Sequence, residues 1–126
     1  MPKTHDYERS SASSIQGHEQ WGAQGLSNTC WGVAKMRVPA PRLFEAVAAE
    51  AEVQIRKFNP QNLSNVVWAF ATLNMPAPRL FEAVAAEAVV QIHNFNTQGL
   101  SNLAWAFATL NMLAPRLFEA VRPRRR

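Results

Sequence analysis

Apolar side chains recur at helical spacing along most of this 126-residue chain. Within residues 60–74, Leu63 and Phe70 fall on one face of a helical wheel, and residues 78–94 repeat the pattern around Val84. The strict alternation of apolar and polar residues that is typical of half-buried strands is absent. The pattern therefore predicts an all-α chain.

Caps and prolines mark where these helices begin and end. Asn59 supplies an N-cap, and Pro60 occupies the first helical position, where a missing N–H does no harm. Pro76 ends the first helix, because a proline pushes the residue before it out of helical angles. Pro78 opens the second helix, so the segment predicts a helix–turn–helix pair.

This helix pair is repeated with a period of 37 residues. Residues 58–84 read FNPQNLSNVVWAFATLNMPAPRLFEAV and residues 95–121 read FNTQGLSNLAWAFATLNMLAPRLFEAV, with 22 of 27 positions identical. A more divergent unit begins near Trp21, so the units span about 21–57, 58–94 and 95–121. One pair cannot bury its apolar faces alone, but stacked pairs can. We therefore expect an α-solenoid of stacked helix–turn–helix repeats.

Two flanking segments lie outside the repeat array of residues 21–121. Residues 1–20 are polar, serine-rich and unpatterned, which predicts a disordered segment. They lack the apolar core of a signal peptide and contain acidic residues that are uncommon in transit peptides, so no clear targeting peptide is recognised. Residues 122–126, RPRRR, form a basic tail.

The composition narrows the function classes. Hydrophobic residues make up 48% and charged residues 17%, as in a folded soluble chain. No apolar run approaches the roughly 20 residues that cross a bilayer, so no membrane association is expected. The net charge of +4 comes from the tail, because without its four arginines nine basic residues face nine acidic ones. The body therefore predicts no broad basic surface for nucleic acid.

The side of each first helix opposite its apolar face carries two amides and an indole, followed by a lysine or a threonine. Stacked units would align these positions, because each recurs after 37 residues. The columns are Gln24, Gln61 and Gln98; Asn28, Asn65 and Asn102; Trp31, Trp68 and Trp105; and Lys35, Thr72 and Thr109. Amides can contact base edges and indoles can stack on bases, so the columns predict a surface for single-stranded RNA.

The same residues also have a structural interpretation. A tryptophan can pack against the adjacent helix, and amides near a helix start can satisfy free backbone groups. The columns vary little between units, whereas a code that reads sequence needs positions that differ. Among the variable positions, the set Gly25, Asn62 and Gly99 lies outside the predicted core, and it is the candidate for tuning RNA recognition.

Two sets of arginines are candidate phosphate contacts: Arg42, Arg79 and Arg116, in the first turn of the second helices, and Arg122, Arg124, Arg125 and Arg126, in the tail. A glutamate follows each arginine of the first set by three residues, which favours solvated Arg–Glu pairs instead. The tail is a generic anion binder, but an address signal or an incidental end fits it equally well.

The residues show no spacing for catalysis or for binding a metal or cofactor. Cys30, the single cysteine, occupies a core position, and the three histidines are scattered. The five glycines form no phosphate-binding loop. We therefore expect no enzymatic activity, no metal and no cofactor.

The motif F-N-P-Q-x-L-S-N-x-x-W-A-F-A-T-L, followed by P-A-P-x-L-F-E-A-V-A-x-E-A, resembles the octotricopeptide and heptatricopeptide repeats. It is also similar to the leucine-rich helical region of FAST-kinase-like, RAP-domain-containing proteins. The resemblance covers about Trp21–Val121. It implies an RNA-binding α-solenoid that acts in mitochondria or chloroplasts on RNA processing, stability, splicing or translation. Nothing in the chain corresponds to the RAP domain, so no catalytic role is carried over.

Two functions from different classes follow. The resemblance and the columns predict a module that binds single-stranded RNA, with protein partners in a ribonucleoprotein assembly. The neutral body favours the alternative, a protein–protein interaction scaffold on the same solenoid. The sequence also predicts self-association through uncapped solenoid ends.

Overall fold

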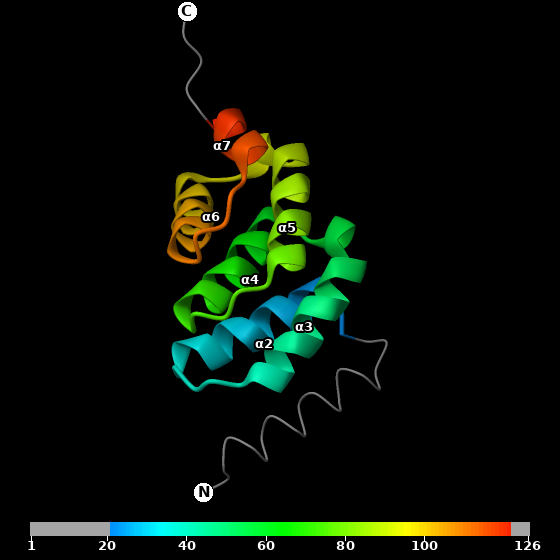
Figure 1. The fold of residues 1–126 in the computed structure, drawn as a ribbon. Coiled ribbons are helices and arrows are strands. Elements are labelled where there is room, and N and C mark those ends of the chain that lie inside the picture. Colours follow the sequence, from blue (N-terminus) through cyan, green and yellow to red (C-terminus); the bar gives the residue numbers. More distant parts are fainter. Residues whose placement is uncertain (1–20, 122–126) are drawn as a thin grey trace, which may run out of the picture.

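In the computed structural model, which describes residues 21–121, the units fold as helix pairs in two layers (Figure 1). The first helices form what we call the helix A layer: α2 (Ala23–Lys35), α4 (Pro60–Thr72) and α6 (Thr97–Thr109). The second helices form the helix B layer: α3 (Pro41–Val53), α5 (Pro78–Val90) and α7 (Pro115–Val121). Residues 21–121 contain no strand. The predicted all-α repeat fold is confirmed, whereas the predicted disordered segment and basic tail lie outside the described residues.

The predicted cap opens α4. The Asn59 side chain accepts a hydrogen bond from the Asn62 N–H at 2.7 Å, and the Asn62 side chain accepts one from the Asn59 N–H at 3.1 Å. This reciprocal capping box satisfies two N–H groups that the helix leaves unpaired. In α6 the Asn96 side chain accepts from the Gly99 N–H at 2.7 Å, but glycine has no side chain to return the bond.

Each helix of the A layer ends earlier than the pattern predicts, at Thr72 rather than Asn74 in the middle unit. Asn74 adopts a left-handed conformation with φ of 53°, which stops the helix. The Met75 N–H then donates to the Phe70 carbonyl at 2.8 Å. Asn111 and Arg37 take the same conformation in the other two units.

The middle helix of the B layer, predicted over residues 78–94, also ends early. The middle one, α5, stops at Val90, and Ile92–Asn94 form a short 3-10 turn, η2; η1 (Ile55–Lys57) follows α3 in the same way. The Gln91 amide donates at 2.7 Å to the Phe58 carbonyl, and Gln54 donates at 2.8 Å to the Trp21 carbonyl. These glutamines join the ends of α3 and α5 to the start of the first helix of the same unit.

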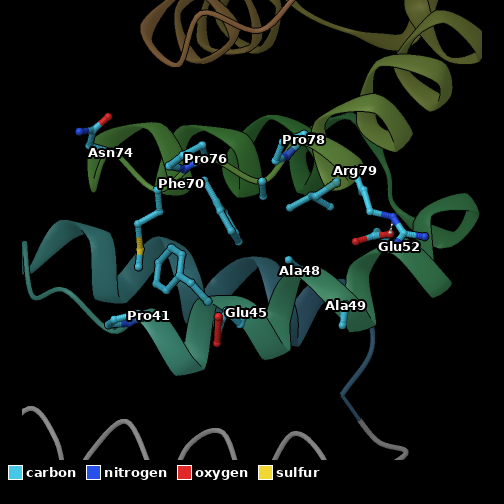
Figure 2. Close-up of a pocket in the computed structure, with 14 residues that line it drawn as sticks. Pro41, Glu45, Ala48, Ala49, Glu52, Phe70, Asn74, Pro76, Pro78 and Arg79 are labelled. Atoms are coloured by element: carbon cyan, nitrogen blue, oxygen red, sulfur yellow. Dashed lines mark ion pairs between the residues drawn. The ribbon is translucent and has the colours of Figure 1, made fainter.

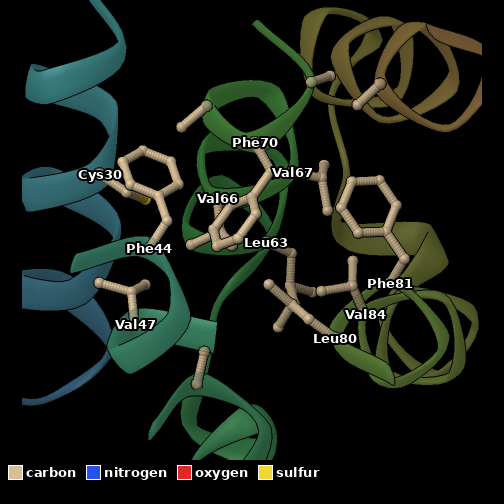
Figure 3. Close-up of a cluster of buried hydrophobic side chains, with 14 of the residues drawn as sticks. Cys30, Phe44, Val47, Leu63, Val66, Val67, Phe70, Leu80, Phe81 and Val84 are labelled. Carbon is tan, nitrogen blue, oxygen red and sulfur yellow. The ribbon is translucent and has the colours of Figure 1, made fainter. Parts of the chain in front are cut away.

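Buried aromatic side chains join the two layers (Figure 3). Phe44 of α3 meets Phe70 of α4 with ring centroids 4.7 Å apart, and Phe81 of α5 meets Phe107 of α6 at 4.8 Å. Leu63 is fully buried beside them, as the helical wheel predicts. A contiguous apolar core therefore runs through the units.

The two layers are packed differently. Within the helix A layer, α2 packs along α4 and α4 packs along α6, whereas α3 and α5 touch over much less of their length. The helix A layer is therefore continuous, and the helix B layer is grooved. None of the helices in residues 21–121 has the length and apolar character to cross a membrane.

Candidate nucleic-acid interface

The predicted columns lie on the side of the helix A layer that faces away from the helix B layer. Phe70 points from α4 toward α3, and the column residues of α4 lie on the other side of that helix. Gln61 is exposed, while Asn65 and Trp68 are half-buried. The structure therefore brings the amide and indole columns together on one face.

Most of the column amides have no hydrogen-bond partner within residues 21–121. Gln24 donates to the Asn28 side chain at 3.2 Å. In the part of the chain that the structure describes, the side chains of Gln61, Asn65, Gln98 and Asn102 make no hydrogen bond. These four side chains can donate to and accept from a ligand.

The indole column combines packing with exposure. The Trp31 and Trp68 rings lie 6.3 Å apart at 38° to each other, and Trp68 also packs against the core. Trp31 is 40% exposed and Trp105 is 46% exposed. The Lys35 ammonium lies 5.2 Å from the centre of the Trp31 ring, a cation–π contact. Trp31 and Trp105 thus retain ring surface on which a base can stack.

The fourth column is not uniform. Lys35 and Thr109 are exposed. The Thr72 hydroxyl is buried and has no hydrogen-bond partner among the residues that the structure describes. A ligand on the surface therefore meets Lys35 and Thr109 but not the hydroxyl of the middle unit.

Asn62, a candidate for tuning recognition, has a structural role instead. It is only 4% exposed. Besides capping α4, its amide donates to the Ser27 hydroxyl at 3.1 Å and to the Gln24 side chain at 3.5 Å. Because these bonds use its side chain to hold α4 against α2, Asn62 is not offered to a ligand.

A polar hollow of about 380 Å³ lies between the first halves of α4 and α6. Its lining includes the column residues Gln61, Asn65, Gln98 and Asn102 together with Asn59, Pro60, Ser64, Asn94, Phe95, Asn96 and Gly99. Ser64 and the segment 94–96 were not among the site residues predicted from the sequence. The sequence did carry a signal for the segment. The asparagine-rich residues 94–96, NFN, precede α6, which has Gly99 where α4 has Asn62.

The arginines of the helix B layer are exposed. Arg79 pairs with Glu52 of α3 at 3.8 Å, across the unit boundary, rather than with Glu82 on its own helix. Since the Arg79 side chain is 88% exposed, the pair is worth little in stability. Arg42 and Arg116 are exposed on α3 and α7. The tail arginines Arg122, Arg124, Arg125 and Arg126 lie outside the described residues.

The groove between α3 and α5 forms a second, apolar hollow of about 510 Å³ (Figure 2). Phe44, Phe70 and Ala48 contribute to its lining, and the Glu52–Arg79 pair lies at one end. This groove lies on the opposite side of the molecule from the columns.

Residues 21–121 contain no cluster of three His, Cys, Asp or Glu side chains that could hold a metal ion. Burial raises the pKa of the Cys30 thiol from 9.0 to about 12. A thiol that stays protonated at neutral pH is a poor nucleophile. Cys30 therefore acts as a small apolar residue of the core.

Comparison with known families matches residues 9–126 to the RNA-editing substrate-binding complex 6 protein family (RESC6). The description of this family does not name the octotricopeptide, heptatricopeptide or FAST-kinase-like proteins that the motif resembles. Comparison with curated proteins and with solved structures gives no match. Because the family match covers nearly the whole sequence, the chain belongs to the RNA-editing substrate-binding complex 6 protein family.

Proposed function

We propose that this protein is an RNA-binding component of an RNA-editing assembly. It holds single-stranded RNA on the exposed face of the helix A layer and performs no catalysis of its own. The observation that carries the proposal is the family match over residues 9–126, since that family is named after an RNA-editing substrate-binding complex. The unpartnered amides and exposed indoles supply a surface of matching chemistry.

In this proposal, affinity comes from bases more than from phosphates. Residues 21–121 contain seven basic and six acidic side chains, so the described body offers little net positive charge. Amides of the columns contact base edges, while Trp31 and Trp105 stack on base faces. Lys35 adds a local positive charge beside the Trp31 ring.

The cellular setting follows from the family and the repeat motif. A component of a substrate-binding complex is expected to have both RNA and protein partners in one ribonucleoprotein assembly. The resemblance to organellar helical-repeat proteins implies a mitochondrion or a chloroplast and a role in RNA processing or stability, and the RNA-editing family favours the mitochondrion. These are parts of the proposal, to be tested by localising the tagged full chain and identifying RNA crosslinked to it.

Fluorescence anisotropy of a labelled single-stranded RNA, titrated with the full chain, tests the proposed surface. Trp105→Ala should weaken binding by about tenfold, because one base–indole stack is worth on the order of 1–3 kcal/mol. The matched control is Trp21→Ala, which removes an indole that lies outside the columns. Equal losses in the two variants, or none in Trp105→Ala, would remove the helix A face as the RNA surface.

The basic tail needs a separate control. Replacing its four arginines with glutamine should lower affinity at low salt and flatten the salt dependence, because fewer counterions are then released. Binding that survives this change and still requires Trp105 belongs to the described body. Binding that disappears belongs to the tail and contradicts the proposal.

A second function, binding of a protein partner, is favoured by the apolar groove between α3 and α5. Its occupant would be a segment of a ribonucleoprotein partner with apolar side chains, seated on Phe44 and Phe70. Ala48→Lys would place a charge in this groove and should abolish that contact while leaving RNA affinity unchanged. If RNA binding failed in Ala48→Lys but persisted in Trp105→Ala, the groove between α3 and α5 would be the RNA surface and the helix A layer would not.

A further inference from the structure

The polar hollow between α4 and α6 lies at a register that a side chain occupies in the junction between α2 and α4. In the latter junction, the Asn62 side chain fills the equivalent place and bonds to Ser27 and Gln24 of α2. In the α4–α6 junction, the equivalent residue is Gly99. One position of the repeat therefore decides whether the space between neighbouring first helices is filled.

The groups around Gly99 show what the missing side chain leaves open. A Cβ atom built there would lie 3.2 Å from the Asn96 side-chain oxygen and 3.3 Å from Cδ2 of Phe95. Ser64, the equivalent of Ser27, accepts no hydrogen bond from a side-chain amide of α6. Its hydroxyl donates to the Pro60 and Gln61 carbonyls of its own helix, at 3.1 and 3.3 Å, as the Ser27 hydroxyl donates to the Gln24 carbonyl. Phe95 is half-buried, whereas its equivalent Phe58 is 1% exposed.

The lining of the hollow combines an aromatic ring with side-chain amides. Phe95 offers an apolar surface, and Gln61, Asn65, Gln98 and Asn102 offer donors and acceptors that have no partner within residues 21–121. A flat ligand with a polar edge matches this lining better than a phosphate, because no cationic side chain lines the hollow. A nucleobase has that chemistry. The volume of about 380 Å³ falls within the range of small-ligand pockets.

We infer that the hollow between α4 and α6 seats one unpaired nucleobase, and that Gly99 keeps this seat open. The inference rests on the proposed RNA-binding function. A base in the hollow would make one contact in addition to those on the surface of the columns. The α4–α6 junction would then be the point at which the RNA is positioned.

Gly99→Asn tests the inference by closing the hollow with the side chain that fills the other junction. Asn62 occupies the same register in α4, and at Gly99 the Asn96 side chain and the Phe95 ring must move by a few tenths of an ångström to admit the new side chain. Affinity is measured by anisotropy for a labelled single-stranded RNA and for a strand of the same length from which every base has been removed. Gly99→Asn should weaken binding of the intact RNA by about tenfold and leave binding of the abasic RNA unchanged.

Two further variants keep the result interpretable. Gly32→Asn makes the same substitution in α2, away from the hollow, where an added Cβ meets no atom within 4 Å, and should leave both affinities unchanged. Asn102→Ala removes one amide of the lining without closing the hollow, and should weaken binding of the intact RNA alone. Circular dichroism confirms that each variant keeps its helices.

The outcomes separate this inference from the function on which it rests. If the wild-type chain binds the intact RNA and Gly99→Asn binds it equally well, the seat is overturned while RNA binding stands. Equal weakening for intact and abasic RNA overturns the seat as well, because the loss would not depend on a base. A wild-type chain that binds neither RNA overturns the proposed function and the inference together.

Discussion

The first junction, between α2 and α4, and the second junction, between α4 and α6, are built from nearly the same repeat, but they differ in what fills them. Both have long helix–helix contact, and in each a phenylalanine of the helix A layer meets a phenylalanine of the helix B layer. Asn62 joins the helices of the first junction through its amide, whereas Gly99 leaves a polar hollow in the second.

This difference separates two tasks that a repeat must perform. The first task is to hold the layers together, and the same apolar residues in every unit perform it. A polar position at the edge of the junction can change without exposing the core. A near-identical array can therefore acquire one distinct site by a single substitution.

The largest expected effect concerns what the junctions share. Phe70→Ala and Phe107→Ala should each lower the free energy of unfolding by about 3–5 kcal/mol, because each empties the space of a buried aromatic ring. Urea denaturation followed by circular dichroism measures both. A much larger loss in only one variant would place the difference between the junctions in their cores rather than at their polar edges.

Asn62→Ala should cost about 1–3 kcal/mol of stability, since it removes half of the capping box and leaves buried polar groups of the first junction without their partner. Asn65→Ala is the matched control, because Asn65 lies on the same helix with no partner in the described residues. A loss equal to that of the control would mean that Asn62 does not hold the junction.

Cys30 lies on the buried face of α2, in the first junction, where the second has Val67. The thiol is neutral in both states below pH 9.0, but between there and about pH 12 only the unfolded chain loses the proton. Stability should therefore fall with rising pH in this window, by about 1.4 kcal/mol per pH unit. Unfolding curves of Cys30→Val should lack this component. An identical alkaline slope in both chains would contradict the prediction.

Gly99→Asn should raise stability by about 0.5–1 kcal/mol. It limits the freedom of the unfolded backbone and supplies the missing half of the capping box beside Asn96. Thermal unfolding compares it with Gly25→Asn, whose new Cβ would contact the Trp21 ring at 3.6 Å. A destabilised Gly99→Asn variant would show that Phe95 cannot shift as Phe58 does, and that the two junctions differ in backbone as well as in side chain.

The smallest effect concerns the turns that lead out of the helix A layer. Arg37 has φ of 56°, a conformation that Asn74 and Asn111 adopt with less strain. Arg37→Asn should stabilise the first unit by about 0.5 kcal/mol. The midpoint of thermal unfolding measures the change, with Arg116→Asn as a surface control. A decrease would indicate that Arg37 makes a contact worth more than the strain.

Much of the fold was predictable because the repeat makes each signal occur more than once. The helical face of Leu63 and Phe70, the Asn59 cap and the proline-marked turn are local signals, and the structure confirms them. The early ends of the helices were not predicted. They depend on the left-handed Asn74 and on the Gln91 bond to Phe58, and the second of these joins residues 33 positions apart.

The site was predictable only as a set of columns. A helical wheel places Gln61 and Asn65 on one side, but it cannot show that Asn62 turns inward to reach Ser27. Nor can it show a hollow, because a hollow depends on a side chain that is absent from the neighbouring helix. The variation at Gly25, Asn62 and Gly99 was visible in the sequence, and only the packing of the units gave it a meaning.

The close packing of the helix A layer also limits the form of RNA that the columns could follow. Bases stacked in a regular strand advance about 3.4 Å per nucleotide. Helices in contact lie about 8–10 Å apart, so equivalent side chains of neighbouring units are separated by more than two such steps. A strand that places one base at each unit must break its stacking between them. The spacing of the helices alone would thus favour an extended, unpaired strand over a duplex.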